Sequence, residues 1–355
     1  EIEKFEKDND EYYEKTYGLI KMFAMYWSIS DILCYFQVVL VLFFGTIGAV
    51  NGDISLGTLV AFISYESLLL WPVRQFGRVL SDLGKALVAV ERINEILVEE
   101  LDEDGEGIKS EVCGEIEFKN VSFAYDGKKD VLKDISFKID KGMSFGIIGP
   151  TGSGKTSLIH LIARLYESTS GNILIDGVNI KEINKKWLRS KIDLVLQEPF
   201  LYTKTIKENI KISNENYTMH DVIEAAKTSA VHSNIIGFDK GYKTLVGEKG
   251  VSLSGGQRQR VAIARNVINH NPILIFDDSL SAVDTETDRL IRKQLKEKMS
   301  DVSTIIISHR ISSIMDCDKI LVLENGEISG LDTHSNLIKT NELYKNIWNI
   351  QNSAS

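Results

Sequence analysis

Two long apolar runs near the N-terminus dominate the hydrophobic pattern of the chain. Ile32–Val50 holds nineteen residues without a charge; as a helix it would be about 28 Å long, close to the roughly 30 Å core of a bilayer. Leu56–Val73 holds eighteen residues, interrupted by Glu66. The pattern predicts two membrane-spanning helices, over about 22–50 and 56–76, with buried core helices as the alternative for each.

The flanks of these runs predict their orientation. Glu1–Lys21 is polar with charge pairs four residues apart, which favours a solvated helix continuing into the first span. Asn51–Ser55 is a tight turn without Lys or Arg, whereas basic residues precede the first span and follow the second, at Lys15, Lys21, Arg74, Arg78, Lys85 and Arg92. By the positive-inside rule both ends are cytoplasmic and the turn is outside.

An acidic segment separates this region from the rest of the chain. Glu99–Ser110 contains glycine and lacks periodicity, as is typical of a linker. We therefore expect a membrane part over 1–98, a linker over 99–112 and a second domain over 113–355.

The second domain changes its hydrophobic period along the chain. Glu115–Tyr125 and Val131–Asp140 alternate as strands do, strands and helices then alternate, and the block from about Lys204 to Ile268 is helical in pattern. The expected fold is an α-helical transmembrane segment followed by an α/β domain. That domain has a mostly parallel core sheet, an antiparallel β part and a helical subdomain.

Composition narrows the function classes. The formal net charge of −9 argues against nucleic acid as a partner. The three cysteines, Cys34, Cys113 and Cys317, have neither metal nor disulfide spacing, which is consistent with reduced thiols.

A glycine-rich run carries the strongest chemical signal. It follows the apolar strand Met143–Ile148, precedes a helical pattern, and reads G-x-x-x-x-G-K-[ST]. Successive backbone N–H groups of such a turn point at one anion, and the following helix adds partial positive charge. We assign nucleotide phosphates and Mg²⁺ to the residues of this loop: Gly149, Pro150, Thr151, Gly152, Ser153, Gly154, Lys155 and Thr156. Lys155 supplies the charge for the outer phosphates and Thr156 an oxygen for Mg²⁺.

Two adjacent acids supply the second half of a phosphate site. The apolar run Pro272–Phe276 leads directly into Asp277 and Asp278. Asp277 is placed to hold Mg²⁺, through water, and Asp278 sits where a base or water-positioning group is needed. A helix N-cap is the alternative for such a pair, which the glycine-rich loop upstream disfavours.

A second glycine-rich turn lies at Leu253–Gln257. Ser254, Gly255 and Gly256 precede an amphipathic run, so they form another helix N-terminus able to face an anion. One chain does not need two anion sockets for one nucleotide.

Together these motifs resemble the ATP-binding cassette (ABC) family, and specifically the C-terminal part of an exporter half-transporter. The resemblance covers essentially the whole chain and implies ATP and Mg²⁺ as cofactors. It implies adenine stacking for Tyr125, a Mg²⁺ contact for Gln197 and a γ-phosphate contact for His309. It also implies an exporter-type loop at Val246–Gly250, a signature whose residues Ser254, Gly255, Gly256 and Gln257 contact a partner's ATP, and a following loop, Ser281–Asp284, that ends on Asp284.

The same resemblance implies an assembly. The two spans would be the last two of six, the chain a fragment, and the location the plasma membrane with the ATPase domain in the cytoplasm. The family commonly has Glu where this chain has Asp278, so we expect a slow site and a heterodimer with a second half-transporter. The exported small molecule, lipid or peptide is not readable from the residues.

Two other classes of function stay open. One is a soluble ABC ATPase of the DNA-repair or translation type, against which the uncharged span 32–50 counts. The other is a mainly regulatory half that binds ATP and hydrolyses it weakly, which Asp278 keeps open. Glu66, an ionisable residue within a span, is a functional candidate by default.

Overall fold

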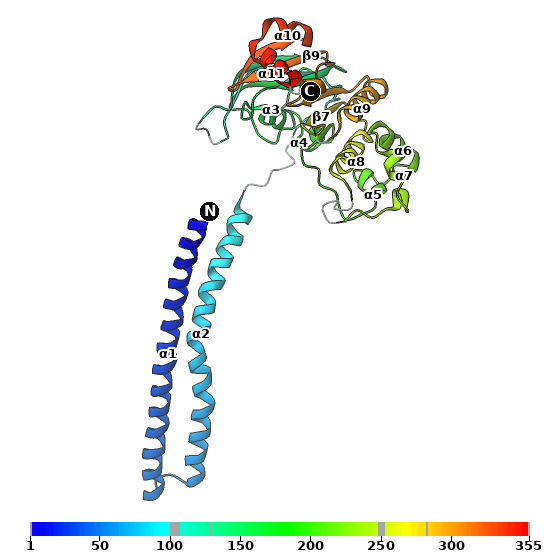
Figure 1. Cartoon of the computed structure of the whole chain (residues 1–355). Helices are drawn as coiled ribbons and strands as arrows, with labels where there is room; N and C mark the ends of the chain where they lie inside the picture. Colours follow the sequence, from blue (N-terminus) through cyan, green and yellow to red (C-terminus); the bar gives the residue numbers. More distant parts are fainter. Residues whose placement is uncertain are drawn as a thin grey trace. The chain divides into compact units, whose positions relative to one another are not determined.

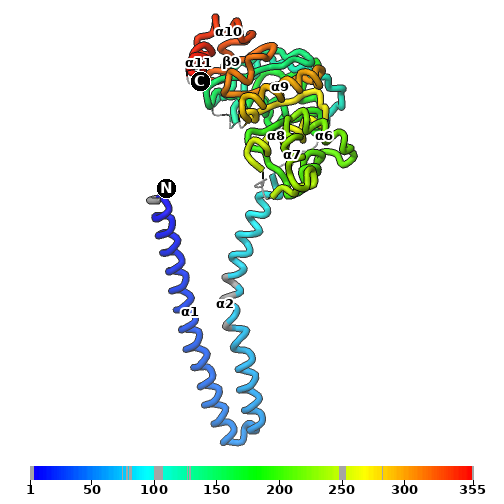
Figure 2. Tube along the Cα trace, turned by 45° about the vertical axis from the view of Figure 1, so that its right-hand side comes forward, coloured from blue at the N-terminus to red at the C-terminus, as the bar shows by residue number. Residues whose placement is uncertain are grey.

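The computed structural model describes residues 2–99, 107–125, 127, 129–247, 253–281 and 283–353. Contacts divide the chain into two units, Glu1–Leu101 and Asp102–Ser355, drawn from blue to cyan and from cyan to red in Figures 1 and 2. Three predicted features lie wholly or partly outside the described residues. These are half of the linker (100–106), the end of the exporter-type loop (248–250) and Ala282.

The first unit is a hairpin of two long helices, α1 (Ile2–Asn51) and α2 (Leu56–Val98). The amide of Asp53 donates to the carbonyl of Gly48 at 2.9 Å, and Ser55 caps α2 by accepting from the amide of Thr58 at 3.1 Å. These bonds close the short connection between the helices (Figure 2). The two predicted helices and the turn between them are confirmed.

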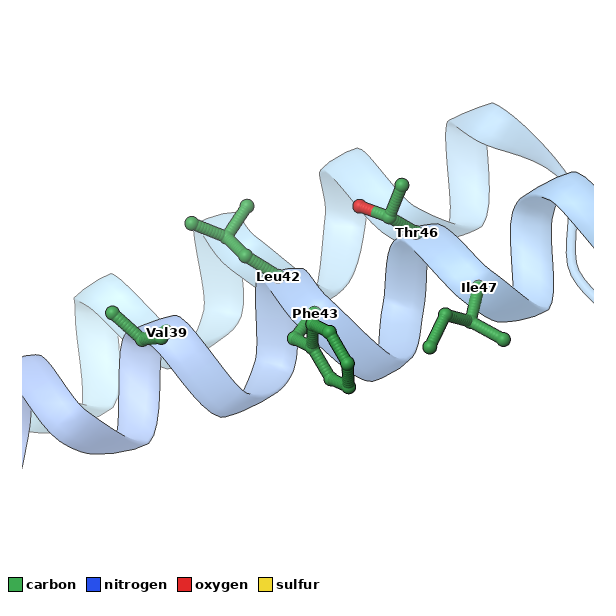
Figure 3. A pocket seen from close by; sticks show the side chains of 5 residues that line it. All are labelled: Val39, Leu42, Phe43, Thr46 and Ile47. Atoms are coloured by element: carbon green, nitrogen blue, oxygen red, sulfur yellow. The ribbon is translucent and has the colours of Figure 1, made fainter.

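Apolar side chains cover the outside of this hairpin. The most apolar 18-residue windows have mean hydropathy 2.2 in α1 and 1.5 in α2, so both are apolar and long enough to cross a membrane. At about 1.5 Å per residue, each helix is longer than a bilayer core is thick. The part of each helix outside its most apolar stretch therefore extends beyond the bilayer core. Figure 3 shows an open hollow on the outer face of α1, lined only by side chains of that helix: Val39, Leu42, Phe43, Thr46 and Ile47.

The seam between the helices is narrow. A Cβ on Gly45 would collide with Leu59, so glycine permits the close approach of α1 and α2 there. Within the part of this unit that the structure describes, Leu59 and Glu66 are the only residues classed as buried. Glu66 lies two turns beyond Leu59 on α2 and faces the same seam.

Two sheets organise the second unit. The antiparallel sheet has the order β2-β1-β4-β5 and is made of β1 (Ile116–Phe123), β2 (Leu132–Ile139), β4 (Ser170–Ile175) and β5 (Val178–Asn179). The larger sheet has the order β10-β9-β3-β8-β7-β6 and is parallel except for β10. Its strands are β3 (Ser144–Ile148), β6 (Ile192–Val195), β7 (Ile273–Asp277), β8 (Ser303–Ile307), β9 (Lys319–Glu324) and β10 (Glu327–Asp332).

Helices flank these sheets and form a lobe of their own. The lobe, yellow-green in Figure 1, holds α5 (Ile206–Ile210), α6 (Met219–Thr228), α7 (His232–Ile236), η1 (Gly241–Lys243) and α8 (Gly255–Val267). The others are α3 (Lys155–Ile162), α4 (Lys185–Arg189), α9 (Thr285–Lys298), η3 (Ile311–Ser313), α10 (His334–Thr340) and α11 (Glu342–Ser353). The predicted parallel sheet, antiparallel part and helical subdomain are confirmed.

Alternating strand residues divide the interior of this unit. Phe145 of β3 joins Phe118 of β1 in a core between the two sheets that also includes α3. On the opposite face of the large sheet, Phe276 of β7 packs in a second core with α9, α10 and α11, which includes Tyr344. A third core around Val261 of α8 holds the helical lobe. The period of two along each strand thus packs helices on both faces of the large sheet.

The end of the predicted linker is already part of the second unit. The amide of Ile108 donates to the carbonyl of Glu182 at 2.9 Å, and the indole of Trp187 donates to the carbonyl of Ser110 at 2.8 Å. Val112 is buried in the core between the sheets. Contacts of this unit therefore begin ahead of the predicted boundary at Cys113.

Candidate functional site

Four neighbouring strands deliver the predicted chemistry to one edge of the large sheet. The glycine-rich loop follows β3, His309 comes two residues after β8, Asp277 ends β7, and Gln197 comes two residues after β6. These strands are parallel and adjacent in the order β3-β8-β7-β6, so their carboxyl ends share one edge. In open α/β sheets this edge is where ligands bind.

Glycine is needed at three positions of the loop for different reasons. Gly152 and Gly154 have φ of 80° and 99°, a region that side chains disfavour. At Gly149 a Cβ would collide with the carbonyl oxygen of Leu323. The loop can therefore turn tightly and bring its backbone N–H groups toward a ligand at the start of α3.

Lys155 is folded against the loop that precedes it. Its Nζ donates to the carbonyls of Gly149 and Pro150, both at 2.9 Å, and the side chain is buried. Burial lowers the pKa of Lys155, while the charges of Asp278 and Asp277 act in the opposite direction. The ammonium group is therefore held among backbone carbonyls and near two acids.

Asp277 and Thr156 meet at the predicted Mg²⁺ position. Burial raises the pKa of Asp277, while the charge of His160, a hydrogen bond with Thr156 and the charge of Lys155 oppose the rise. A carboxylate and a hydroxyl from two different elements thus face each other, and oxygen ligands of this kind suit Mg²⁺.

Asp278 adopts an unusual backbone conformation beside His309. Its φ is 44°, its amide donates to the carbonyl of Ile307 at 3.0 Å, and its carbonyl accepts from the hydroxyl of Ser281 at 2.7 Å. The amide of His309 approaches the Oδ1 of Asp278 at 3.5 Å, a long contact. Two of the three predicted catalytic residues, Asp278 and His309, are thus brought together by the backbone of His309 and the side chain of Asp278, and the third, Gln197, follows β6 at the same sheet edge.

Tyr125 lies near the far end of the same loop. Its hydroxyl is 2.8 Å from the hydroxyl of Ser157 on α3, and its ring makes edge contacts with Phe123 and Tyr166 at centroid distances of 4.8 and 5.0 Å. The side chain is nevertheless 46 % exposed. The hydroxyl and the edge of the Tyr125 ring are thus held in place while the side chain remains accessible, as stacking on a nucleotide base requires.

The helical lobe carries the signature on its surface. Ser254 caps α8 in a reciprocal pair with Gln257: the amide of Gln257 donates to the Ser254 hydroxyl at 3.2 Å, and the Ser254 amide donates to Oε1 of Gln257 at 3.0 Å. Ser254 and Gly255 are exposed. Asp284 likewise caps α9 by accepting from the amide of Thr287 at 2.9 Å. The helix N-terminus of the signature is thus presented to solvent.

The sequence prediction missed residues that hold these groups in place. Gln197 is exposed, and the backbone just before it is held by Gln259 of α8, whose Nε2 donates to the carbonyl of Leu196 at 3.1 Å. Gln259 is 1 % exposed. The sequence signal for Gln259 was a polar residue within the otherwise apolar face of α8. The sequence held no signal for the contact that Ser157 makes with Tyr125.

The loop fits the phosphates of a nucleotide. The hydroxyl of Ser153 is buried and has no hydrogen-bond partner among the described residues, which is costly unless a ligand supplies one. A Cβ at Gly149 would collide with its surroundings, so the loop presents bare backbone at this position. An orphan donor, a bare backbone and a buried ammonium are the groups that a phosphate requires.

Known proteins resemble both units of the chain. Residues 1–73 match the family description "ABC transporter transmembrane region", and residues 132–281 match "ABC transporter". The putative multidrug export ATP-binding/permease protein YgaD of Bacillus subtilis is 37 % identical over 94 % of this chain and 57 % of its own length. The uncharacterized ABC transporter ATP-binding protein YknU of the same organism is 38 % identical over 99 % of this chain and 61 % of its own.

This chain belongs to the ABC transporter family. A solved structure of a bacterial Atm1-family ABC exporter with ATP bound superposes with a TM-score of 0.79 at 32 % identity, over 91 % of this chain and 57 % of that one. The chain therefore spans about three fifths of the length of these relatives.

Membership settles several expectations. Members of the family use ATP with Mg²⁺, and the hairpin lies in the plasma membrane with the second unit in the cytoplasm. The match of residues 1–73 to a transmembrane region leaves the soluble-ATPase alternative without support.

Proposed function

We propose that the chain is the ATP-binding and hydrolysing part of an ABC exporter, which couples hydrolysis to export of a substrate across the membrane. The observation that carries the proposal is one sheet edge that gathers a phosphate loop, two acids, Gln197 and His309, in a chain that also holds two bilayer-length helices. Domain limits of 1–98 and 113–355, joined by the linker, are part of the proposal. The word export in the names of relatives supports it.

Each residue has a task in this scheme. The loop amides and Lys155 bind the outer phosphates, and Tyr125 stacks on adenine. Thr156 and Asp277 would hold Mg²⁺ together with Gln197, and the bound metal would neutralise charge on the phosphates. Asp278 orients the attacking water, while His309 contacts the γ-phosphate. Catalysis then consists mainly of positioning and electrostatics.

The exposed signature points to a second half-transporter. Ser254, Gly255, Gly256 and Gln257 form a helix N-terminus on the surface of the helical lobe, and the proposed partner closes its own ATP against it. In return, the partner's signature would close over the loop at Lys155. The cargo, a small molecule, a lipid or a peptide, crosses between the membrane parts.

The pair is proposed to be a heterodimer with unequal sites. Asp is one methylene shorter than Glu, which retracts the carboxylate by about 1 Å, and misplacement on that scale can cost on the order of a hundredfold in rate. The φ of 44° at Asp278 lies in a region that Asp tolerates better than most side chains, so the backbone itself suits the shorter acid. This observation also supports a second candidate, a mainly regulatory half with weak hydrolysis.

The acid itself supplies the test. The assembled pair is purified with the partner's catalytic acid neutralised, and ATPase rates are compared for wild type, Asp278→Glu and Asp278→Asn. The proposal expects Asp278→Glu to raise the rate. In the otherwise unmodified pair, Asp278→Asn should barely change total turnover. An active homodimer with normal rates, or loss of turnover in Asp278→Asn, would contradict unequal sites, and the absence of any ATPase activity in every form would contradict hydrolysis altogether.

A further inference from the structure

The last turn of α11 reaches the loop that carries His309. Gln351 uses both ends of its side-chain amide there: Oε1 accepts from the amide of Ile311 at 2.9 Å, and Nε2 donates to the carbonyl of His309 at 2.6 Å. The residue thus bridges two backbone groups that lie on either side of Arg310. Nothing in the family motifs above involves this residue.

The same loop is fixed at two other points. The amide of Ser308 donates to the carbonyl of Ile147 on β3 at 3.2 Å, and the amide of His309 approaches Oδ1 of Asp278 at 3.5 Å. Beyond His309, the amide of Arg310 donates to the hydroxyl of Ser308 at 3.0 Å. Gln351 holds the outer side of this loop, while the sheet and the catalytic acid hold the inner side.

The helix that presents Gln351 is firmly seated. Tyr344 of α11 is fully buried in the core that also holds Phe276 of β7, and its hydroxyl lies 2.7 Å from Nδ1 of His334. The ring of Trp348 packs edge-on against the same His334 at a centroid distance of 5.0 Å. A side chain on the next turn of an anchored helix can therefore fix a loop rather than follow it.

The primary amide of Gln351 satisfies both backbone groups. The amide of Ile311 needs an acceptor and the carbonyl of His309 needs a donor, so the orientation of the Gln351 amide is determined by its partners. A carboxylate of the same length can accept from Ile311 but would face the His309 carbonyl with a second acceptor.

We propose that Gln351 is a positioning residue for hydrolysis: it clamps the peptide at His309 so that the imidazole and the amide beside Asp278 stand in register with the γ-phosphate. This rests on the proposed ATPase function. Movement of α11 relative to the sheet would be transmitted directly to the His309 loop through this one side chain.

The test compares Gln351→Glu with the neighbouring exposed control Asn352→Ala in the full-length pair, purified in detergent with the partner's catalytic acid neutralised, so that the measured kcat is that of this chain's own site. Loss of one hydrogen bond and introduction of a repulsion should lower kcat for ATP about tenfold. Affinity for ADP, which has no γ-phosphate, should stay within about twofold of wild type, since the loop at Lys155 and Tyr125 is untouched. Gln351→Ala, which removes both bonds without adding charge, should lower kcat by a similar or smaller factor.

Three outcomes decide the matter. Lowered kcat with unchanged ADP affinity and an unchanged melting temperature supports the clamp. Wild-type kcat in both Gln351 variants overturns it, as does a parallel fall of kcat, ADP affinity and melting temperature, which would show a structural role only. Failure of the wild-type protein to bind ADP or hydrolyse ATP would contradict the proposed function itself and is read from the control protein.

Discussion

The hairpin exposes apolar side chains of the same kinds that the cytoplasmic unit buries. Phe43 of α1 is 59 % exposed, whereas Phe276 of β7 is 0 % exposed and packs in a core shared with α9, α10 and α11. A water-facing surface with as many exposed aromatic and aliphatic residues as the hairpin would aggregate. The difference shows that each unit is built for its own solvent, lipid for the first and water for the second.

A buried acid in each unit sharpens this contrast. Asp193 of β6 is 5 % exposed, and its Oδ1 accepts from the side-chain Nδ2 of Asn269 at 2.6 Å. Glu66 of α2 is 9 % exposed, and both its oxygens are buried without a hydrogen-bond partner among the described residues. The cytoplasmic unit satisfies its buried acid internally, whereas Glu66 stays a candidate for function within the membrane part.

Truncating one aromatic ring in each unit should give the largest difference in stability between the two units. Phe276→Ala leaves a cavity in a close-packed core and should destabilise the cytoplasmic unit by about 3–5 kcal/mol. Phe43→Ala removes a ring from the outer surface of α1 and should leave the melting temperature of that unit unchanged. Thermal melts of both variants, followed by circular dichroism, provide the measurement, and equal losses would contradict the assignment of two solvents.

The pH dependence of stability should expose the buried acid of the cytoplasmic unit. Burial raises the pKa of Asp193 to about 6, although hydrogen bonds from Asn269 and Asn271 oppose the rise. An unfolded Asp titrates near 3.9, so the folded state binds more protons between about pH 4 and pH 6. Stability from this group is therefore present below that window and falls as pH rises through it, by about 2–3 kcal/mol.

Asp193→Asn is the matched variant, because it cannot titrate. Urea melts of the cytoplasmic unit at pH 4.5 and 6.5 should show a smaller loss of unfolding free energy in the variant than in wild type. Parallel curves for the two proteins would mean that Asp193 does not carry the raised pKa.

Replacement of Tyr125 should give the smallest of these effects. Tyr125→Ala removes the ring proposed to stack on adenine and should weaken ATP binding by about 1–3 kcal/mol. Tyr125→Phe keeps the ring and loses only the contact with the Ser157 hydroxyl, so its affinity should lie near wild type. Calorimetric titration with ATP separates the two variants, and equal losses would assign the effect to the hydroxyl rather than the ring.

Local signals in the sequence predicted most of this architecture. The hairpin follows from two apolar runs on either side of Asn51–Ser55, and the phosphate loop follows from a strand, glycines, Lys155 and a helix in direct succession. These features are contiguous, so their physics is contained within a short window. The alignment of the loop with Asp277 and His309 required only the rule that parallel strands end at one edge.

Contacts between distant residues were beyond sequence reasoning. Gln259 and Gln351 act through side-chain bonds to backbone that lies 63 and 42 residues away, and neither belongs to a pattern. The left-handed Asp278 is held by Ser281 nearby in sequence, but also by Ile307 of β8, which is 29 residues away. The burial of Glu66 likewise depends on the register between α1 and α2 at Gly45.

Binding of ATP with Mg²⁺ to the purified protein, measured by calorimetric titration for wild type and Lys155→Ala, tests the central claim most directly. Lys155 lies buried on the loop carbonyls of Gly149 and Pro150, and its ammonium is the charge proposed for the outer phosphates. The account predicts saturable binding by wild type and strongly weakened binding by Lys155→Ala, with circular dichroism unchanged. Equal affinity of the two proteins for ATP would contradict the phosphate site and, with it, the proposed function.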